Sequence, residues 1–465
     1  MIASAQKDAA GYLVSRLAAF ALDPSPPSAT ALNEGKRIIL DQLACQTAAA
    51  PLSWSVGYLQ SAKSYAAADD GPRVVFHGDR LRIDQTAFVN GTFGQGAEFD
   101  DTHLRSSTHS GAVIVPTVLA FADHRTMSGT EALHAVIVGV ETLIRISTAA
   151  APYLHRRGHH VPPAVGPFGA AAAASRIMGL DHAHCLHAIS IAGSHSAGLL
   201  EFTHAGGSVK RCHCGIAAMS GVRAAFLARQ GITGPLAILE GRRGFFNAFA
   251  GQYNLDIVSE GLGSEYLFCE MGYKPMTSAF PAHAPLEAIG ILKDEHDLTA
   301  EDIESIEIGT SRHSLEHVGV IREPRDITDA HYSVAFGAAI RLIRGSNGFY
   351  DYRDEDLKDP RFLDIVRRVT VKVDPVADEE RLKLNNRGAI VTILTKDGRK
   401  LEKRLQYSKG HPKNPMSNDE LTQKFRDTVT PRLGKDRTEE LAERVWDIEE
   451  LADASVLVDL TIKPG

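Results

Sequence analysis

The chain has 465 residues, of which 44% are hydrophobic and 23% are charged, as is typical of a globular protein. This length predicts two domains, and the net charge of -7 does not fit a nucleic-acid-binding protein, which usually carries a basic excess. No uninterrupted apolar run reaches about 18 residues, so the sequence predicts no membrane span.

The cysteines and the N-terminal residues indicate a compartment. Five cysteines, sparse and odd in number, do not form the pattern of a disulfide framework. Residues 1–10 include Lys7 and Asp8 and have no apolar core, which is not the pattern of a secretory signal. We therefore expect a reducing environment and a cytoplasmic protein.

The first part of the chain predicts helices. Apolar residues recur at helical spacing over residues 12–21, 31–49, 114–122, 131–146, 168–178, 185–200, 215–230 and 235–239. Ser128-Gly129-Thr130-Glu131 matches a capping box at the start of one of them. The alanine run 170–174 predicts a buried helix with close neighbours, because small side chains allow helices to approach.

The pattern changes after Lys274. Alternating apolar and polar residues at 303–309 and 368–374 predict strands, and residues 389–394 and 401–407 around Asp397-Gly398 predict a β-hairpin. A helix is expected at 335–344, and helical spacing returns over residues 417–454. The predicted fold is therefore mostly α with an α+β second domain: residues 1–272 and 409–465 form a helical domain, and residues 273–408 form an α+β domain inserted before the C-terminal helices.

Polar residues gather in the stretch from Gly94 to Gly111. Asp100, Asp101, Thr102, His103 and His109 together offer groups for proton transfer and for hydrogen bonds to a substrate. The alternative is structural, because Asp and Thr often cap helices. The local pattern leaves both interpretations open.

Two further stretches combine turns with basic residues. The first contains His155, His159 and His160 and is followed by Val161-Pro162-Pro163. These histidines either lie in a site that the proline turn holds rigidly or belong to an exposed basic loop. Gly206-Gly207 leads through Lys210, Arg211 and His213 into a helix, where free N–H groups and the helix dipole favour an anion. Here too a solvated helix start is an equal alternative.

A fourth stretch joins the two predicted domains. It runs from Tyr273-Lys274-Pro275 to His283, and ligand sites often lie at such junctions, although a simple linker would also fit. Cys212-His213-Cys214 is spaced too tightly for a zinc site, so no metal is expected. Phosphate-binding, dinucleotide-binding, serine-hydrolase and metallopeptidase motifs are absent from the sequence.

Taken in order, these stretches resemble the MmgE/PrpD family. The resemblance covers nearly the whole chain and is carried by the following strings: Leu40-Asp41-Gln42-Leu43, Glu98-Phe99-Asp100-Asp101-Thr102, Gly207-Ser208-Val209-Lys210-Arg211-Cys212-His213, Gly231-Ile232-Thr233-Gly234-Pro235, Arg243-Gly244-Phe245-Phe246, Tyr273-Lys274-Pro275, Asp329-Ala330-His331-Tyr332-Ser333 and Gly410-His411-Pro412-Lys413-Asn414-Pro415. The family includes 2-methylcitrate dehydratase, cis-aconitate decarboxylase and iminodisuccinate epimerase. Each string is weak alone, but their joint order is specific.

The resemblance implies a helical domain and a smaller α+β lid in a homodimer, with a cofactor-free active site in a cleft. It implies the catalytic residues His109, His160, Lys210, His213, Lys274 and His283. Glu98, Asp101, Thr102 and Arg211 are the expected substrate-binding residues. The expected partner is a small carboxylic acid, with no nucleic acid and no membrane.

Two residues depart from the family pattern. Glu98 replaces an aspartate, and Phe336 stands where many members have a tyrosine whose hydroxyl is proposed to matter in decarboxylation. The missing hydroxyl argues against cis-aconitate decarboxylation. The number of residues between the Glu98–Thr102 string and His109 also differs slightly from the family pattern.

The chemistry implied is proton movement at a carbon beside a carboxylate. That proton is weakly acidic, so its removal needs a base and nearby cations. His109 and His160 are the expected acid/base pair, since histidine titrates near neutral pH. The leading hypothesis is a dehydratase; a Cα epimerase, a decarboxylase and a catalytically inactive binding protein are the alternatives.

Overall fold

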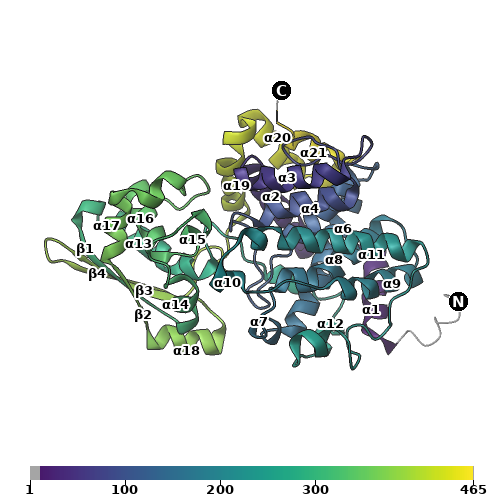
Figure 1. Cartoon of the computed structure of the whole chain (residues 1–465), viewed down its shortest axis with the longest axis horizontal. Coiled ribbons are helices and arrows are strands. Elements are labelled where there is room, and N and C mark those ends of the chain that lie inside the picture. Colours follow the sequence, from purple (N-terminus) through teal and green to yellow (C-terminus); the bar gives the residue numbers. More distant parts are fainter. Residues whose placement is uncertain (1–10, 464–465) are drawn as a thin grey trace. The chain divides into compact units, whose positions relative to one another are not determined.

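The computed structural model describes residues 11–463, so the predicted absence of a secretory signal at residues 1–10 lies outside the described residues. The chain divides into two compact units (Figure 1). Of the described residues, unit 1 comprises 11–96, 100–271 and 418–463, and unit 2 comprises 97–99 and 272–417.

Unit 1 is built from helices, without a named strand in its described residues. Its helices are α1 (Leu13–Leu22), α2 (Ala29–Ala49), α3 (Ser53–Ala66), α4 (Ile83–Gln95), α5 (Gly111–Ala122), α6 (Gly129–Ala150), α7 (Tyr153–Arg156), α8 (Val161–Ile177), α9 (His182–Ala192), α10 (Phe202–Ala205), α11 (His213–Arg229), α12 (Asp256–Ser259), α19 (Asn418–Leu433), α20 (Lys435–Trp446) and α21 (Ser455–Thr461). Several of these helices have a side-chain cap at the N-terminus. At the start of α6, for instance, the Ser128 side chain accepts a hydrogen bond from the Glu131 N–H.

The central helices of unit 1 pack closely because small residues face one another. A Cβ added at Gly221 of α11 would lie 2.7 Å from backbone atoms of α8, and one added at Gly215 would lie 2.1 Å from the Phe88 carbonyl oxygen of α4. The alanine run 170–174 of α8 is wholly buried, as predicted. Helix α6 is long and apolar enough to cross a membrane, but 94% of its apolar window is buried inside the protein, as in a core helix.

Two buried ion pairs tie distant segments of unit 1 together. The Lys424 ammonium on α19 lies 2.6 Å from the Asp41 carboxylate on α2. On α6, Glu141 accepts the N–H groups of Leu267 and Phe268 and pairs with Arg145, which donates to three carbonyls between residues 257 and 265. The C-terminal helices and the loop before residue 268 are therefore anchored on the N-terminal helices.

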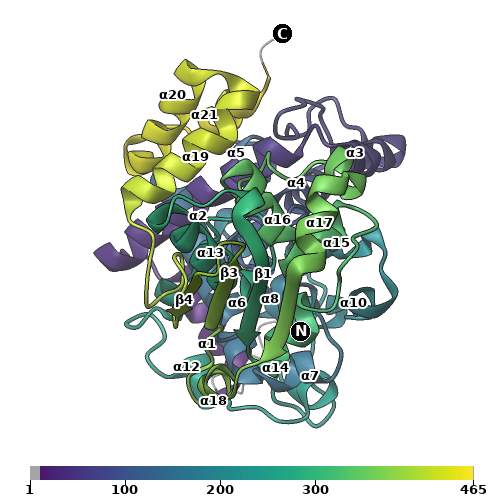
Figure 2. The same ribbon diagram turned by 90° about the vertical axis from the view of Figure 1, so that its left-hand side faces the viewer.

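Unit 2 is an α+β fold. It contains α13 (His283–Glu295), β1 (Ile303–Thr310), α14 (Arg312–Val318), α15 (Ile327–His331), α16 (Val334–Arg344), α17 (Pro360–Arg368), β2 (Val369–Val373), α18 (Pro375–Leu384), β3 (Ala389–Thr395) and β4 (Lys400–Leu405). The strand order is β2-β1-β3-β4, with β1 parallel to β2 and antiparallel to β3 (Figure 2).

The core of unit 2 lies between the sheet and its helices. Buried and half-buried residues alternate along β3, and α13 packs on β3 and β4. Phe336 of α16 is fully buried in this core and stacks on Phe362 of α17.

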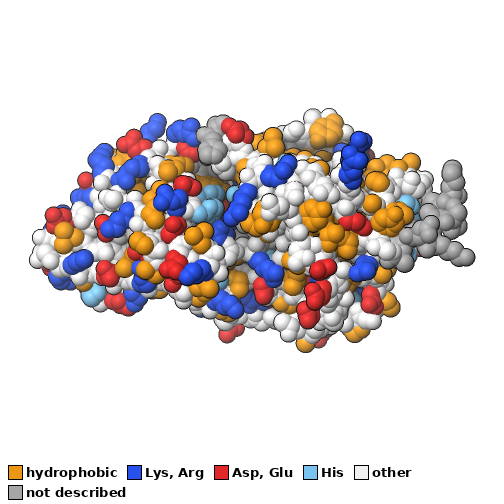
Figure 3. Space-filling model, turned by 90° about the horizontal axis from the view of Figure 1, so that it is seen from below, with side chains coloured by type: hydrophobic (Ala, Val, Ile, Leu, Met, Phe, Trp, Pro, Cys, Tyr) orange, Lys and Arg blue, Asp and Glu red, His pale blue; other side chains and the backbone are white. Residues whose placement is uncertain are grey.

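On the face of the molecule in Figure 3, lysine and arginine are intermingled with aspartate and glutamate.

The fold confirms the predicted class, a mostly α protein with an α+β second part, and differs from the prediction in detail. The predicted helix at 235–239 is wrong, because these residues form turns. The predicted helix at 185–200 ends at Ala192, and α8 begins at Val161, since prolines in a first turn lose no helical hydrogen bond. Unit 1 resumes at Asn418 rather than at 409, and residues 97–99 belong to unit 2.

Candidate active site

Three helices of unit 1 begin close together. His109 lies two residues before α5, His160 is the N-cap of α8, and His213 is the first residue of α11. The Cys214 thiol lies 3.8 Å from the His109 carbonyl oxygen, and the His160 and His213 rings touch. Because helix N-termini carry partial positive charge, this region attracts an anion.

His160 and His213 form a direct imidazole pair. Their Nδ1 atoms lie 2.8 Å apart in a buried contact, and the Phe202 ring packs edge-on against both. A neutral pair can make this hydrogen bond only if one ring carries its proton on Nδ1 and the other on Nε2. One Nε2 therefore has a lone pair while the other carries a hydrogen, so the pair offers a base and an acid together.

The surroundings keep both rings of the pair neutral. Burial, followed by the charge of His213, holds the pKa of His160 well below its usual range. Burial and the neighbouring Lys210 charge lower the pKa of His213 to about 4. At neutral pH the pair is therefore uncharged and able to accept a proton.

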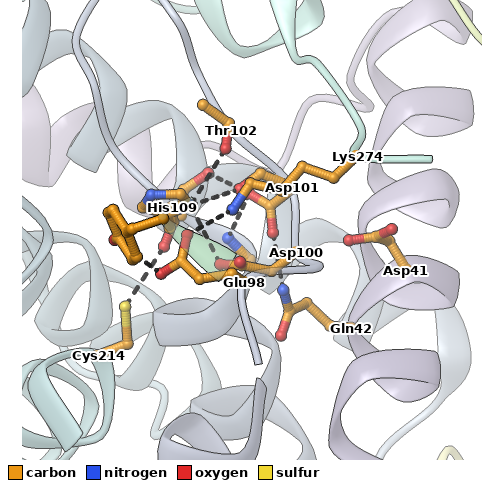
Figure 4. Close-up of polar contacts among 12 residues, drawn as sticks. Asp41, Gln42, Glu98, Asp100, Asp101, Thr102, His109, Cys214 and Lys274 are labelled. Carbon is orange, nitrogen blue, oxygen red and sulfur yellow. Dashed lines mark hydrogen bonds and ion pairs between the residues drawn. The ribbon is translucent and has the colours of Figure 1, made fainter. Parts of the chain in front are cut away.

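His109 is oriented by the loop that precedes α5 (Figure 4). Its Nδ1 lies 2.8 Å from the Asp101 carbonyl oxygen, 3.1 Å from the Asp100 carboxylate and 3.2 Å from the Thr102 hydroxyl. Because a carbonyl oxygen only accepts, Nδ1 carries the proton and Nε2 is left as the basic atom. The Asp100 carboxylate is a second acceptor for the same Nδ1–H.

The Asp101 side chain has a structural position. It accepts the Gly111 N–H at the start of α5, at 3.0 Å, and the Gln42 amide at 2.8 Å (Figure 4). Burial, then the charges of Asp100 and Asp41, raise its pKa to about 7. The contacts of the Asp101 carboxylate therefore fit the helix-capping interpretation, and its contact with substrate stays a prediction.

The two basic residues before α11 differ in their surroundings. Lys210 is 4% exposed, and its charge acts on His213. The Arg211 guanidinium instead lies 4.5 Å from the centre of the Trp54 ring of α3. Lys210 is therefore the better placed cation for an anion beside the imidazole pair.

The cysteines around His213 diverge. The Cys212 thiol lies 3.1 Å from the Val209 carbonyl oxygen, whereas Cys214 faces His109. Across residues 11–463, no group of three or more His, Cys, Asp or Glu is placed to hold a metal ion.

In unit 2, Glu98 joins Lys274 to a tyrosine. One oxygen of the buried Glu98 carboxylate lies 3.0 Å from the Lys274 ammonium, and the other accepts a hydrogen bond of 3.2 Å from the Tyr332 hydroxyl. The Glu98 backbone has φ +55°, a left-handed conformation that is uncommon for a residue with a side chain. Glu98 is thus held as a bridge between a cation and a phenol.

His283, also in unit 2, is fully buried at the first position of α13. Its ring stacks on Phe280, with 4.9 Å between the ring centres, and its Nε2 lies 3.2 Å from the Ser278 carbonyl oxygen. Since that oxygen only accepts, Nε2 carries the proton.

The structure gathers most of the predicted residues within their own units. In unit 1 the cluster unites Thr102, His109, His160, Lys210 and His213, and in unit 2 Glu98 meets Lys274.

Sequence reasoning did not predict a role for Tyr332, and it grouped Asp100 with the candidate residues without choosing it as a site residue. Asp100 had a signal, because it lies inside the polar stretch, but adjacent aspartates cannot be told apart without backbone directions. Tyr332 had no local signal, since its partner Glu98 is 234 residues away in the chain.

Comparison with known proteins identifies the family. Residues 15–258 match the MmgE/PrpD N-terminal domain, and residues 276–448 match the MmgE/PrpD C-terminal domain. The chain is 28% identical to cis-aconitate decarboxylase of Aspergillus terreus, over 92% of this chain and 91% of that protein. It is also 28% identical to the human cis-aconitate decarboxylase, over 83% and 81% of the two chains. The chain therefore belongs to the MmgE/PrpD family.

Proposed function

We propose that this protein is a cofactor-independent lyase that acts on a small polycarboxylic acid by proton transfer at a carbon beside a carboxylate. Family membership and decarboxylase relatives support an enzyme of the lyase kind. The observation that carries the proposal is the neutral His160–His213 pair beside Lys210, where three helices begin.

The cluster in unit 1 has the parts that this chemistry needs. A carbon acid beside a carboxylate loses its proton only when a base is positioned and cations stabilise the charge that spreads onto the carboxylate. An imidazole Nε2 without a hydrogen serves as the base, and Lys210 with the three helix N-termini holds the carboxylate.

Dehydration is the reaction that the imidazole pair favours. The basic Nε2 takes the proton from carbon, the electron pair of that C–H bond forms the C=C bond, and the C–O bond breaks. The Nε2–H of the other ring protonates the departing hydroxide, which leaves as water. Elimination thus uses an acid and a base in one event, which matches the complementary tautomers of His160 and His213.

Decarboxylation is the second candidate, favoured by the names of the relatives. There the bond between carbon and a carboxylate breaks, carbon dioxide leaves, and the Nε2–H of one imidazole protonates the carbon that keeps the electron pair, with the proton replaced from solvent. This route needs an acid but no leaving hydroxide. The side chain at position 336, where the sequence lacks a tyrosine, lies in the apolar core of unit 2.

The test is turnover of a panel of citrate-like and aconitate-like acids, followed by mass spectrometry in deuterated water. Dehydration removes the mass of water and decarboxylation releases carbon dioxide. Epimerisation would place deuterium in recovered acid without an alkene product.

His160→Gln is expected to lower kcat by about 10²- to 10⁴-fold, as for loss of a general acid or base. The matched control is His159→Gln, the neighbouring histidine, whose half-exposed ring contacts Phe249 and not the pair. It should stay within about twofold of the parent. Parent-like turnover by His160→Gln would end the assignment, and no turnover by the parent across the panel would favour a binding protein.

A further inference from the structure

Arg387 of unit 2 is a buried arginine without an acidic partner. It lies between α18 and β3 and is only 8% exposed. Within residues 11–463, its guanidinium makes no hydrogen bond and no ion pair, and its buried Nη1 has no partner.

The groups around Arg387 add positive charge. The charge of Arg381 on α18 acts directly on Arg387, and Arg387 and Lys413 both act on His411, whose pKa burial and these charges lower to about 4. The carboxylate of Glu380 on α18 lies near in the chain, but its oxygens accept hydrogen bonds from the Asn386 and Gln406 amides. Among the described residues, Arg381 is the charge that acts on Arg387, and no acid is among its electrostatic partners.

Burial does not remove the charge of Arg387. Burial, followed by the charge of Arg381, lowers its pKa to about 9, so the side chain is still protonated at pH 7. A buried charge without a partner is costly, and proteins that keep one usually provide a counter-ion.

An aromatic ring, that of Phe280, also lies near the guanidinium. The centre of the Phe280 ring lies 6.0 Å from the guanidinium carbon, and an aromatic ring of this kind takes up no strong N–H hydrogen bond. The N–H groups of an arginine form a rigid fork that matches two oxygens of one anion.

We propose that Arg387 is the centre of an anion-binding site in unit 2, which takes a small oxyanion with a carboxylate or phosphate group. Arg381 and Lys413 supply further positive charge, and Phe280 supplies an apolar wall. All residues of this site belong to unit 2, and the site does not depend on the proposed reaction.

The experiment compares the full-length protein with Arg387→Met by thermal unfolding and isothermal titration. Inorganic phosphate and citrate are the probes, and sodium chloride at equal ionic strength is the blank. The parent is expected to gain several degrees in Tm with at least one probe, and Arg387→Met is expected to lose most of this gain together with one binding site per chain. The probe with the lower Kd identifies the anion as a phosphate or an organic carboxylate.

The matched control is Arg404→Met, which removes an exposed arginine of β4 that is paired with Asp374. It should keep the full anion-dependent gain. Without anion, Arg387→Met is expected to be at least as stable as the parent, because methionine replaces an unpaired charge by an apolar chain of similar length.

The proposal is overturned if Arg387→Met keeps the rise in Tm that the anion gives the parent and binds the same number of anions per chain. If that variant does not fold, Arg387→Lys decides the matter, since it keeps the charge but lacks the fork. It should weaken the tighter probe at least tenfold, and unchanged affinity would overturn the site. His160→Gln alone is expected to keep the anion-dependent rise in Tm, and adding Arg387→Met to it should abolish that rise as it does in the parent. Failure of the proposed activity and failure of this site can therefore be distinguished.

Discussion

Glu98 shows how one side chain positions another. Its left-handed backbone conformation is unfavourable for a residue with a Cβ, by about 1 kcal/mol. Its two carboxylate oxygens are divided between the Lys274 ammonium and the Tyr332 hydroxyl. The hydrogen bond from the Tyr332 hydroxyl therefore restricts the orientation of the Glu98 carboxylate, and with it the position of the Lys274 ammonium.

Removing this phenol tests whether Tyr332 acts through Glu98 on Lys274. Tyr332→Phe is expected to lower kcat/KM by about 3- to 30-fold, because a misplacement near a reacting group is costly even when no contact with substrate is lost. Its free energy of unfolding should fall by only about 1 kcal/mol, the usual worth of one hydrogen bond.

Tyr253→Phe is the matched control. It removes a hydrogen bond of similar length, 3.1 Å to Asn247, in unit 1. It is expected to leave kcat/KM and its pH profile unchanged. If both variants change activity equally, Tyr332 has no specific positioning role.

The residues predicted at this scale were those whose chemical type is informative by itself. Histidines and lysines beside glycine-rich turns pointed to His160, Lys210 and His213, and the structure brings these three together. Asp100 was a candidate that was not chosen as a site residue, and Tyr332 was not predicted, because their contacts depend on side-chain directions and on folding over long sequence separations.

Among the elements, α5, α8 and α11 set the position of the imidazoles. Their close packing depends on small residues at the contacts, for example Gly221 of α11 against α8. A change in the spacing of these two helices would move His160 relative to His213, since each ring lies at the first turn of its helix.

Two glycine-to-alanine substitutions separate packing from helix propensity. Gly221→Ala is expected to destabilise the protein by about 1–3 kcal/mol, because its new Cβ would meet backbone atoms of α8 at 2.7 Å. Gly57→Ala, in α3, has nothing within 4 Å and is expected to stabilise by about 0.5–1 kcal/mol.

Chemical denaturation of the two variants measures both effects. Activity should fall in Gly221→Ala and not in Gly57→Ala. Equal stabilisation of both variants would show that α8 and α11 are not in the close contact described.

For the molecule as a whole, the buried neutral histidines set the response to acid. Burial is the largest cause that lowers the pKa of His103, to about 3, and those of His213 and His411, to about 4. An unfolded chain protonates these rings below pH 6.5, whereas the folded protein does not. Each ring therefore contributes stability that is present above pH 6.5 and is lost as the pH falls towards its folded value.

His103 isolates this effect, because its ring is fully buried and its Nδ1 lies 2.7 Å from the Ser106 hydroxyl. Relative to His103→Gln, the parent should lose about 2 kcal/mol of unfolding free energy between pH 8 and pH 5. Urea unfolding at several pH values measures the difference between the two proteins. Parallel curves would show that His103 does not titrate differently in the folded and unfolded states.

The sequence by itself determined the fold class, the strands of the α+β part and most of the long helices, because hydrophobic periodicity and turn residues act over short distances. It also indicated the family, through strings of residues along the whole chain.

Only the tertiary structure decided which of these residues meet. The tautomers of His160 and His213, the bridge from Lys274 through Glu98 to Tyr332, and the lack of an acid beside Arg387 all depend on distances between segments far apart in the chain. Whether a hydrogen bond or an ion pair forms depends on interatomic distances of a few tenths of a nanometre. A local sequence pattern does not specify such distances between segments far apart in the chain.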